Sequence, residues 1–445
     1  MAAMSDESDL IPRAVPRGRL ARFGAFGRLG VGVAGGMVAE GARRLAAGER
    51  PRVGDMLLTP ANVGRVADQL SQLRGAAMKL GQMISMDAGD LLPPELSAVL
   101  ARLRDRAHRM PPAQLQQVLA AEWGADWRKR FRRFEAGPIA AASIGQVHRA
   151  TLPDGRVLAV KVQYPGVADS IDADVDNVAT LLRVSGLLPA GFDIAPLLAV
   201  AKEQLREEAD YAREAAQLQR FRALIGDSPD FLVPDLEPAF STARVLAMDF
   251  IESVPIETLE TADQATRDAM MTRLIGLVLR ELFVFGQMQT DPNFANYRIE
   301  TATGRLVLLD FGAARAVAPE TAVAYARLLR AGLDGDQAAM RNAAVAAGFI
   351  SPAAVERHGD RIDRILQVIL AEFGRSDRFD FGDRRFVGMI KEEAIAMAED
   401  RSIWHVPPTD MLFVQRKVSG TALLAARLKA RVDLRALIEP WVRGS

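Results

Sequence analysis

Three oxygen-bearing side chains occur at characteristic spacings within residues 288–312 of this chain. Asp291 is followed five positions later by Asn296, and the apolar run 306–309 leads into the tripeptide Asp310-Phe311-Gly312. Carboxylate and amide oxygens at this spacing suit the binding of a nucleotide with its Mg²⁺. We therefore predict that Asp291 faces the attacking oxygen of a phosphoryl transfer. Asn296 and Asp310 are predicted to hold Mg²⁺ on the phosphates of ATP or ADP.

A phosphate-binding segment is predicted upstream of these residues. Residues 140–147 overlay the kinase pattern Gly-x-Gly-x-x-Gly-x-Val, with alanine at the first two glycine positions. A hairpin is expected around Pro153-Asp154-Gly155, and a lysine on its second strand would meet the α- and β-phosphates. Alanine does not supply the positive φ angles of glycine, so this loop should be stiffer and nucleotide selectivity should change. The predicted phosphate-binding residues are Ala140, Ala141, Ala142, Ser143, Gly145, Val147 and Lys161.

An acidic stretch follows the hairpin. Residues 193–224 are predicted to form one long helix that carries Glu208, Asp210 and Glu214. At helical spacing Asp210 lies about 40° from Glu214, while Glu208 lies about 120° from it. One helix could therefore present carboxylates to two different lysines at the nucleotide site. A solvated acidic face is the alternative.

The remainder of the chain predicts a short linker and then a largely helical region. Residues 243–255 should form a strand that runs into a linker, where a kinase carries its adenine-binding hinge, and we assign Met248 and Ile251 to that hinge. The predicted helices are 266–287, 320–332, 335–347, 352–373, 384–400 and 410–438.

Two patterns limit the kinase interpretation. A second Asp-Phe-Gly begins at Asp380, but it follows polar residues rather than an apolar strand. The sequence Ala318-Pro319-Glu320 resembles the end of a kinase activation segment, yet it begins six residues after Gly312. A protein kinase needs a longer segment there to dock its peptide substrate, so we do not expect protein kinase activity.

The amino-terminal third contains a basic tail and a helical extension. Between Arg13 and Arg44 there are seven arginines against one acid, Glu40, in a glycine-rich segment. This tail could lie on an anionic membrane surface or be disordered. From residue 60 the spacing of apolar residues predicts a helix, on which Lys79 and Gln82 lie off the apolar stripe. A surface lysine beside a packing glycine is the alternative to a functional role.

Composition excludes several classes of protein. With 49% hydrophobic residues the chain can bury a large core, and with no cysteine it has neither disulfides nor thiolate metal sites. The net charge of zero gives no case for nucleic acid binding. No apolar run reaches the length of about 20 residues that spans a bilayer, so no transmembrane helix is predicted.

Together these motifs resemble the UbiB-type atypical kinase-like proteins that support ubiquinone biosynthesis. The resemblance implies an α+β, two-lobed protein-kinase-like fold with a helical amino-terminal extension and a largely helical C-lobe. We expect a tail over 1–50, the extension over 51–135, the N-lobe over 136–255 and the C-lobe over 256–445. It also implies that Glu214 pairs with Lys161, that Glu208 and Asp210 meet the extension, and that Lys79 and Gln82 contribute to catalysis there. The motifs are Lys79-Leu80-Gly81-Gln82, the loop 140–147, Val160-Lys161, Glu208-Ala209-Asp210 with Glu214, Gln289-Thr290-Asp291-Pro292-Asn293 with Asn296, and Asp310-Phe311-Gly312.

We consider two functions on this basis. The first is a Mg²⁺-dependent ATPase or kinase of a small molecule or lipid, in the cytoplasm and peripheral on the inner membrane. The alternative is a nucleotide-gated module that binds a hydrophobic quinone precursor and presents it to ubiquinone-biosynthesis enzymes without turnover. Both functions predict nucleotide and Mg²⁺ binding. They differ in whether Asp291 is required.

Overall fold

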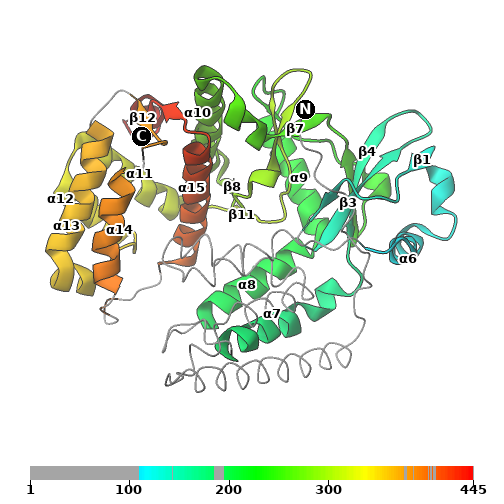
Figure 1. The fold of residues 1–445 in the computed structure, drawn as a ribbon, viewed down its shortest axis with the longest axis horizontal. Helices are drawn as coiled ribbons and strands as arrows, with labels where there is room; N and C mark the ends of the chain where they lie inside the picture. The colour runs from blue at the N-terminus through cyan, green and yellow to red at the C-terminus, as the bar shows by residue number, and fades with distance from the viewer. Residues whose placement is uncertain are drawn as a thin grey trace, which may run out of the picture. The chain divides into compact units, whose positions relative to one another are not determined.

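The computed structural model describes residues 110–142, 144–184, 195–374, 378–383, 385–398, 400, 403 and 407–443. The described residues form two compact units. Figure 1 labels their helices and strands. Unit 1 holds those up to Gln219 together with Asp235–Phe250, and unit 2 holds Arg220–Pro234 and those from Ile251 onward.

Some predictions fall on residues that the structure does not describe. They are the basic tail 1–50, the part of the extension that carries Lys79 and Gln82, and Ser143 in the alanine-rich segment.

Unit 1 is built around an antiparallel sheet. Its strands run in the order β1-β3-β4-β6, with β2 paired to β3. The predicted hairpin is confirmed: β3 and β4 pair along their whole length, and Gly155 between them has a φ of 91°, which glycine adopts without strain. The strands are β1 (Arg133–Phe134), β2 (Ala140–Ala141), β3 (Gly145–Thr151), β4 (Val157–Gln163) and β6 (Val245–Asp249).

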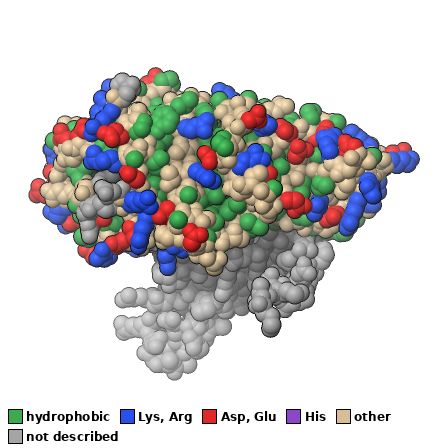
Figure 2. Space-filling model, turned by 90° about the horizontal axis from the view of Figure 1, so that it is seen from above, with side chains coloured by type: hydrophobic (Ala, Val, Ile, Leu, Met, Phe, Trp, Pro, Cys, Tyr) green, Lys and Arg blue, Asp and Glu red, His purple; other side chains and the backbone are tan. Residues whose placement is uncertain are grey.

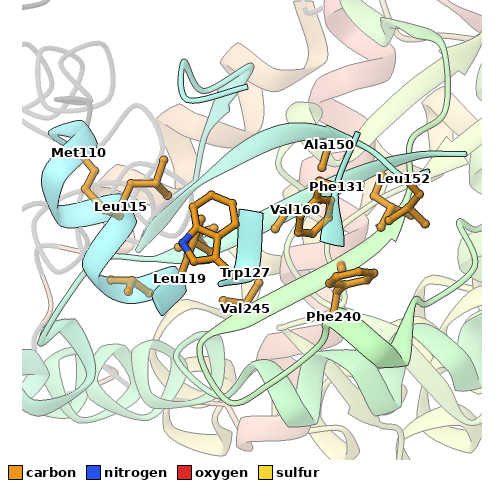
Figure 3. Packing of buried hydrophobic residues seen from close by; sticks show 14 of the residues in the cluster. Met110, Leu115, Leu119, Trp127, Phe131, Ala150, Leu152, Val160, Phe240 and Val245 are labelled. Carbon is orange, nitrogen blue, oxygen red and sulfur yellow. The ribbon is translucent and has the colours of Figure 1, made fainter. Parts of the chain in front are cut away.

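One face of this sheet packs on an aromatic and aliphatic core (Figure 3). Alternation along β4 directs Leu158, Val160 and Val162 into the core, where each is fully buried. Trp127 and Phe131 cover them from the segment that follows α6 (Pro112–Trp123) and includes the turn η4 (Trp127–Arg130). The same alternation sends Lys161 and Gln163 to the opposite face of β4.

Three helices complete unit 1: α7 (Val167–Val184), α8 (Ala195–Glu208) and the first part of α9 (Tyr211–Ile225). The prediction of a single helix over 193–224 is wrong, because α8 ends at Glu208 and α9 begins at Tyr211. Two side chains explain the break. Asp210 Oδ1 accepts from the backbone N–H of Arg213, 2.9 Å away, as a capping residue does. Gln163 Nε2 donates to the carbonyl oxygen of Ala209, 2.9 Å away.

Unit 2 contains a four-stranded sheet and a two-stranded ladder. The sheet has the order β5-β10-β9-β7, and the ladder pairs β8 with β11. These strands are β5 (Phe231–Leu232), β7 (Ser253–Pro255), β8 (Gln287–Gln289), β9 (Tyr297–Glu300), β10 (Leu306–Leu308) and β11 (Ala314–Ala316).

Helices make up most of the remainder of unit 2. The helix predicted over 266–287 ends earlier, because α10 gives way at Glu281 to one π-helical turn, η7 (Glu281–Phe285), which closes at Gly286 with a φ of 55°. The helices predicted between 320 and 400 are confirmed within a few residues. The helices of unit 2 are α10 (Gln264–Arg280), α11 (Pro319–Asp334), α12 (Gln337–Ala346), α13 (Pro352–Gly374), α14 (Arg385–Ala398), α15 (Thr409–Arg427) and α16 (Leu434–Arg443). Unit 2 also has the short turns η6 (Ile256–Thr261) and η8 (Phe294–Asn296). The short turn η5 (Pro238–Phe240) belongs to unit 1.

The predicted helix 410–438 is wrong as one element. After α15 the chain reverses through Lys429, which has a left-handed φ of 51°, and forms β13 (Arg431–Val432). This strand pairs with β12 (Phe379–Asp380), which ends on the first residue of the second Asp-Phe-Gly sequence. Asp380 forms an ion pair of 3.0 Å with Arg431 there. The second Asp-Phe-Gly therefore belongs to a strand pair.

The described surface carries both signs of charge. On the face shown in Figure 2, basic and acidic side chains alternate with hydrophobic ones. Among the helices of the described residues, none combines the length and the apolarity that crossing a bilayer requires.

His148 is expected to make the stability of unit 1 depend on pH. Its Nδ1 lies 2.9 Å from the carbonyl oxygen of Glu135 and its Nε2 lies 2.8 Å from Gln146 Nε2. Gln146 Oε1 already accepts from the backbone N–H of Met110, so Gln146 Nε2 donates to His148 and the imidazole is neutral. Burial lowers the pKa of His148 below its ordinary value.

A lowered folded-state pKa means that protonation favours the unfolded chain. The stabilisation is present above the unfolded-state pKa of about 6.5 and is lost as pH falls through the lower folded-state value. We expect the melting temperature to fall on going from about pH 7.5 to about pH 5.5, and the fall to be smaller in His148→Leu. Thermal unfolding at both pH values checks this. An equal fall in the two proteins would contradict it.

Candidate active site

A buried ion pair lies on the face of β4 opposite the unit 1 core. Lys161 Nζ is 2.8 Å and 2.9 Å from the two carboxylate oxygens of Glu214. The exposed fractions of the two side chains are 10% and 2%. Isolated charges at such burial are strongly destabilising, so each side chain depends on the other. The ammonium of Lys161 also lies 5.1 Å from the centre of the Tyr211 ring.

The break between α8 and α9 places Glu214 on a helix separate from Glu208. Lys161 and Gln163 are two residues apart on one face of β4; Gln163 holds the break at Ala209, and Lys161 holds Glu214 in the next helical turn. The angular separation expected for a single helix therefore does not apply. Glu208 is buried at the end of α8, and Asp210 is an exposed cap of α9. The structure brings Glu214, and not Asp210, to Lys161.

The alanine-rich segment forms a strand rather than an open loop. Ala140 pairs with Val147 and Ala141 with Gln146, and the backbone N–H of Ala142 donates to the carbonyl oxygen of Gly145. Ala140 and Ala141 are exposed. Their role in phosphate binding stays a prediction.

Gly145 is required at its position by close packing. A Cβ atom there would lie 2.5 Å from the carbonyl oxygen of Val162 and 2.8 Å from the hydroxyl of Tyr211. The glycine of the motif thus allows β3 to approach the strand and helix that carry Lys161 and Glu214. Of the two predicted hinge residues, Met248 is buried in β6, where it pairs with Ala159. Ile251 is partly buried and is the first residue of the second segment of unit 2.

In unit 2 the predicted catalytic loop is tied together by Asn296. Its Nδ2 lies 3.1 Å from the carbonyl oxygen of Asp291 and 3.5 Å from the Asp291 carboxylate. Its backbone carbonyl accepts from the N–H of Leu309, one residue before Asp310. Asn296 is buried. Because its amide nitrogen donates within the loop, its side-chain oxygen is the group left to face a metal.

Asp310 has a backbone conformation unusual for a residue other than glycine. Its φ is 63°, in the left-handed region, which costs of the order of 1 kcal/mol and persists where the surroundings hold it. Its Oδ1 accepts from the N–H of Gly312 at 3.2 Å. Phe311 is buried, with its ring 4.8 Å from that of Phe221. The two residues that follow Asp310 therefore anchor the turn, Gly312 through its N–H and Phe311 through its buried ring.

Gln289 connects the two halves of this arrangement. Its Nε2 donates to the carbonyl oxygen of Asp291 at 2.8 Å and to that of Asp310 at 3.2 Å. The next residue, Thr290, donates its hydroxyl to the carbonyl oxygen of Ala313 at 2.7 Å. The ladder between β8 and β11 runs alongside these contacts. Asp291, Asn296 and Asp310 are thus brought together within unit 2.

The sequence did not reveal two buried residues of this network, Glu281 and Lys417. Lys417 Nζ donates to Gln289 Oε1 at 3.2 Å and lies 3.3 Å from the carboxylate of Glu281. Lys417 occurs next to Arg416 in a helix, a pattern that indicates a solvated face. No signal in the local sequence marks it as buried.

The side-chain oxygens of Asp310 and Asn296, predicted to bind a metal, are of the type that suits Mg²⁺ on a nucleotide. Within the part of the chain that the structure describes, no three Asp, Glu or His side chains gather in a way that would hold a metal ion by themselves. Mg²⁺ usually takes one or two protein oxygens and completes its octahedron with substrate phosphates and water. Asp310 and Asn296 fit that requirement as a pair.

These features are typical of a kinase-like protein. Lys161 on a strand pairs with Glu214 on a helix, and the amide of Gln289 joins the catalytic loop to the Asp-Phe-Gly turn. Residues 102–344 match the model of the ABC1 atypical kinase-like domain. The chain belongs to this family of atypical kinases, and the resemblance to the UbiB-type proteins is confirmed.

Relatives cover nearly the whole chain. The protein named "Atypical kinase COQ8, mitochondrial" of Saccharomyces cerevisiae is 36% identical over 427 residues, which are 96% of this chain and 85% of that protein. The "Probable serine/threonine-protein kinase abkA" of Dictyostelium discoideum is 32% identical, over 94% of this chain and 78% of that protein.

A solved structure supports the fold. The complex of Rv3197 with erythromycin from Mycobacterium tuberculosis has a TM-score of 0.59 and 27% identity, and covers 84% of this chain and 93% of that one. The predicted α+β, kinase-like fold with a largely helical carboxy-terminal part is confirmed.

The packing around Gly145 gives a test of the unit 1 geometry. We expect Gly145→Ala to lower the free energy of unfolding by about 1–3 kcal/mol, because the added methyl group meets a backbone oxygen that cannot move without shifting β4. Gly137→Ala is the matched control, since a Cβ there has no neighbour within 4 Å. Denaturant unfolding measures both. Equal stability of the two variants would show that the close approach at Gly145 is not required.

Proposed function

We propose that this chain is an atypical kinase-like enzyme that transfers the terminal phosphoryl group of ATP to water or to a small or lipid acceptor, in support of ubiquinone biosynthesis. The observation that carries the proposal is the amide of Gln289, which donates to the carbonyl oxygens of both Asp291 and Asp310. One side chain thereby holds the acceptor-facing residue and a metal ligand in a fixed relation.

Each group has a role that its chemistry supports. Lys161, oriented by Glu214, would bind the α- and β-phosphates, and Asn296 and Asp310 would hold Mg²⁺. The ion, when bound, neutralises charge on the phosphates. Asp291 would orient the acceptor hydroxyl and take up its proton. The bond from the γ-phosphorus to the bridging oxygen breaks as the bond to the acceptor oxygen forms, and ADP leaves.

The segment after the Asp-Phe-Gly turn argues against a protein acceptor. It forms β11 immediately and then enters α11 at Pro319. Pro319 is the first residue of that helix and Glu320 lies in its first turn, so the sequence Ala318-Pro319-Glu320 is a helix start. Seven residues separate Phe311 from Pro319, which leaves no peptide-docking segment of the kind that protein kinases use. Water, a small molecule or a lipid is the acceptor that we propose, although the Dictyostelium relative carries a protein kinase name.

The proposed function implies two partners, an anionic membrane surface and a hydrophobic quinone precursor. We expect the chain to act at an anionic membrane surface on the cytoplasmic side, through the basic segment 1–50, and to receive a hydrophobic quinone precursor. Apolar acceptors of this kind reside in membranes. Anionic liposomes and a quinone-precursor analogue should therefore raise the rate of ATP hydrolysis.

Two aspartates with the same local sequence provide the sharpest test of the metal site. Asp310→Asn should lower kcat for ATP hydrolysis by about 10²-fold or more, because it removes a charged metal ligand. Asp380→Asn is the matched control, because Asp380 also begins an Asp-Phe-Gly and its Oδ1 also accepts from the following glycine N–H, at 2.8 Å. Hydrolysis should be unchanged in this control.

The assay is run on the full-length chain with and without liposomes and the quinone-precursor analogue. If wild type hydrolyses ATP no faster than Asp310→Asn under every condition, the enzyme proposal fails. Asp291→Asn separates turnover from binding. If turnover is required, this variant should no longer support ubiquinone biosynthesis. Retained ubiquinone biosynthesis would favour the nucleotide-gated binding module instead.

A further inference from the structure

A lysine is buried in unit 2 at a distance in sequence from every residue assigned to the reaction. Lys417 lies in α15 with 1% of its side chain exposed. Its ammonium faces three oxygens: the Tyr297 hydroxyl at 2.9 Å, Gln289 Oε1 at 3.2 Å and the Glu281 carboxylate at 3.3 Å. An ammonium has three N–H donors and no acceptor. Two of these contacts are hydrogen bonds, to Tyr297 and Gln289, and the third is an ion pair with Glu281.

The ammonium determines which way the amide of Gln289 points. Because Lys417 can only donate, it bonds to the amide oxygen, and the amide nitrogen is directed toward the carbonyl oxygens of Asp291 and Asp310. The reversed amide would place its oxygen against two carbonyl oxygens and its nitrogen against a cation. Lys417 thus excludes the orientation that would push the catalytic loop and the Asp-Phe-Gly turn apart.

The partner carboxylate comes from the π-helical turn. Glu281 is the first residue of η7, at the point where α10 changes its hydrogen-bond pattern, and its side chain is 2% exposed. Burial raises the pKa of Glu281 to about 7, an effect that the nearby ammonium of Lys417 opposes. π-turns within helices occur frequently at functional sites.

A purely structural explanation is less economical. Two apolar side chains of similar volume often stabilise a protein as well as a buried ion pair does, or better. A buried lysine at this position is explained by the direction of its hydrogen bonds, which an apolar side chain cannot supply.

We infer that Lys417 is a positioning residue for phosphoryl transfer, which acts through the amide of Gln289 to fix the backbone of Asp291 and Asp310. Its catalytic meaning rests on the proposed function. Its effect on the geometry of the two segments does not.

The test uses variants of the full chain in which loss of orientation is separated from loss of stability. Lys417→Met alone leaves Glu281 without its cation and is expected to be unstable. Glu281→Gln/Lys417→Met removes both charges and should retain a melting temperature near that of wild type. Its kcat for ATP hydrolysis should still fall about 10- to 100-fold, because the loop is no longer held. Its affinity for ATP in the presence of a chelator should be unchanged.

Gln289→Glu provides a second approach. The carboxylate would still accept from Lys417, so the packing is retained, but the two N–H donors to Asp291 and Asp310 are lost. The same fall in kcat is expected. Asp268→Asn is the control for a general loss of stability: Asp268 is a buried carboxylate on α10 that accepts from the backbone N–H of Arg431 at 2.7 Å. It should lower the melting temperature and leave kcat near the wild-type value.

Hydrogen exchange gives a readout that does not require turnover. Amides of peptides covering 287–296 and 309–314 should exchange faster in the double variant and in Gln289→Glu, while peptides from the middle of α10 keep the wild-type rate. Absence of hydrolysis in wild type would refute the proposed function while this measurement still decides the positioning role. Wild-type exchange in both peptides, or an unchanged kcat in the double variant, would overturn the inference.

Discussion

A single buried amide holds the chemistry-bearing part of unit 2 together. Gln289 receives a hydrogen bond from Lys417 and donates two, to the carbonyl oxygens of Asp291 and Asp310. The ladder between β8 and β11 fixes the register of the same two segments. The ladder alone would leave Asp291 and Asp310 free to move beyond its ends, and the amide removes that freedom. The left-handed backbone of Asp310 is sustained by these surroundings.

Unit 1 contains a comparable buried ion pair, between Lys161 and Glu214, with a different structural role. Lys161 is also a buried lysine paired with a glutamate, but both oxygens of Glu214 contact the same ammonium. In unit 1 the pair sets the position of the lysine itself, whereas in unit 2 Lys417 sets the orientation of another side chain. Both pairs depend on an interruption in a helix: the break before Tyr211 precedes Glu214, and the π-turn begins at Glu281.

Local sequence patterns predicted the features that are set by interactions between residues close together in the chain. The hairpin around Gly155, the lysine on its second strand and the short segment after Gly312 follow from turn residues, alternation and spacing. The distinction between Asp310 and Asp380 also came from context, because an apolar strand precedes only the first. The family resemblance supplied the pairing of Lys161 with Glu214, which spacing alone left open.

Features that depend on contacts distant in sequence were not predictable in this way. The residues around Ala209 read as a continuous helix, and the break becomes intelligible only once Gln163 is seen to bind the Ala209 carbonyl oxygen. Lys417 has the local sequence of a solvated helix face, and nothing near it indicates that Tyr297 and Glu281 surround its ammonium. Buried polar networks of this kind are set by tertiary packing, so their members carry no periodic signal.

We propose that unit 2 holds Mg²⁺ on a bound nucleotide through Asp310 and Asn296. Calorimetric titration of ATP into the full-length chain, with Mg²⁺ and with a chelator, tests it most directly. We expect an affinity at least about tenfold higher with Mg²⁺, a gain of about 1.4 kcal/mol, and we expect this gain to disappear in Asp310→Asn. Equal affinity of the wild-type chain with and without Mg²⁺ would contradict it.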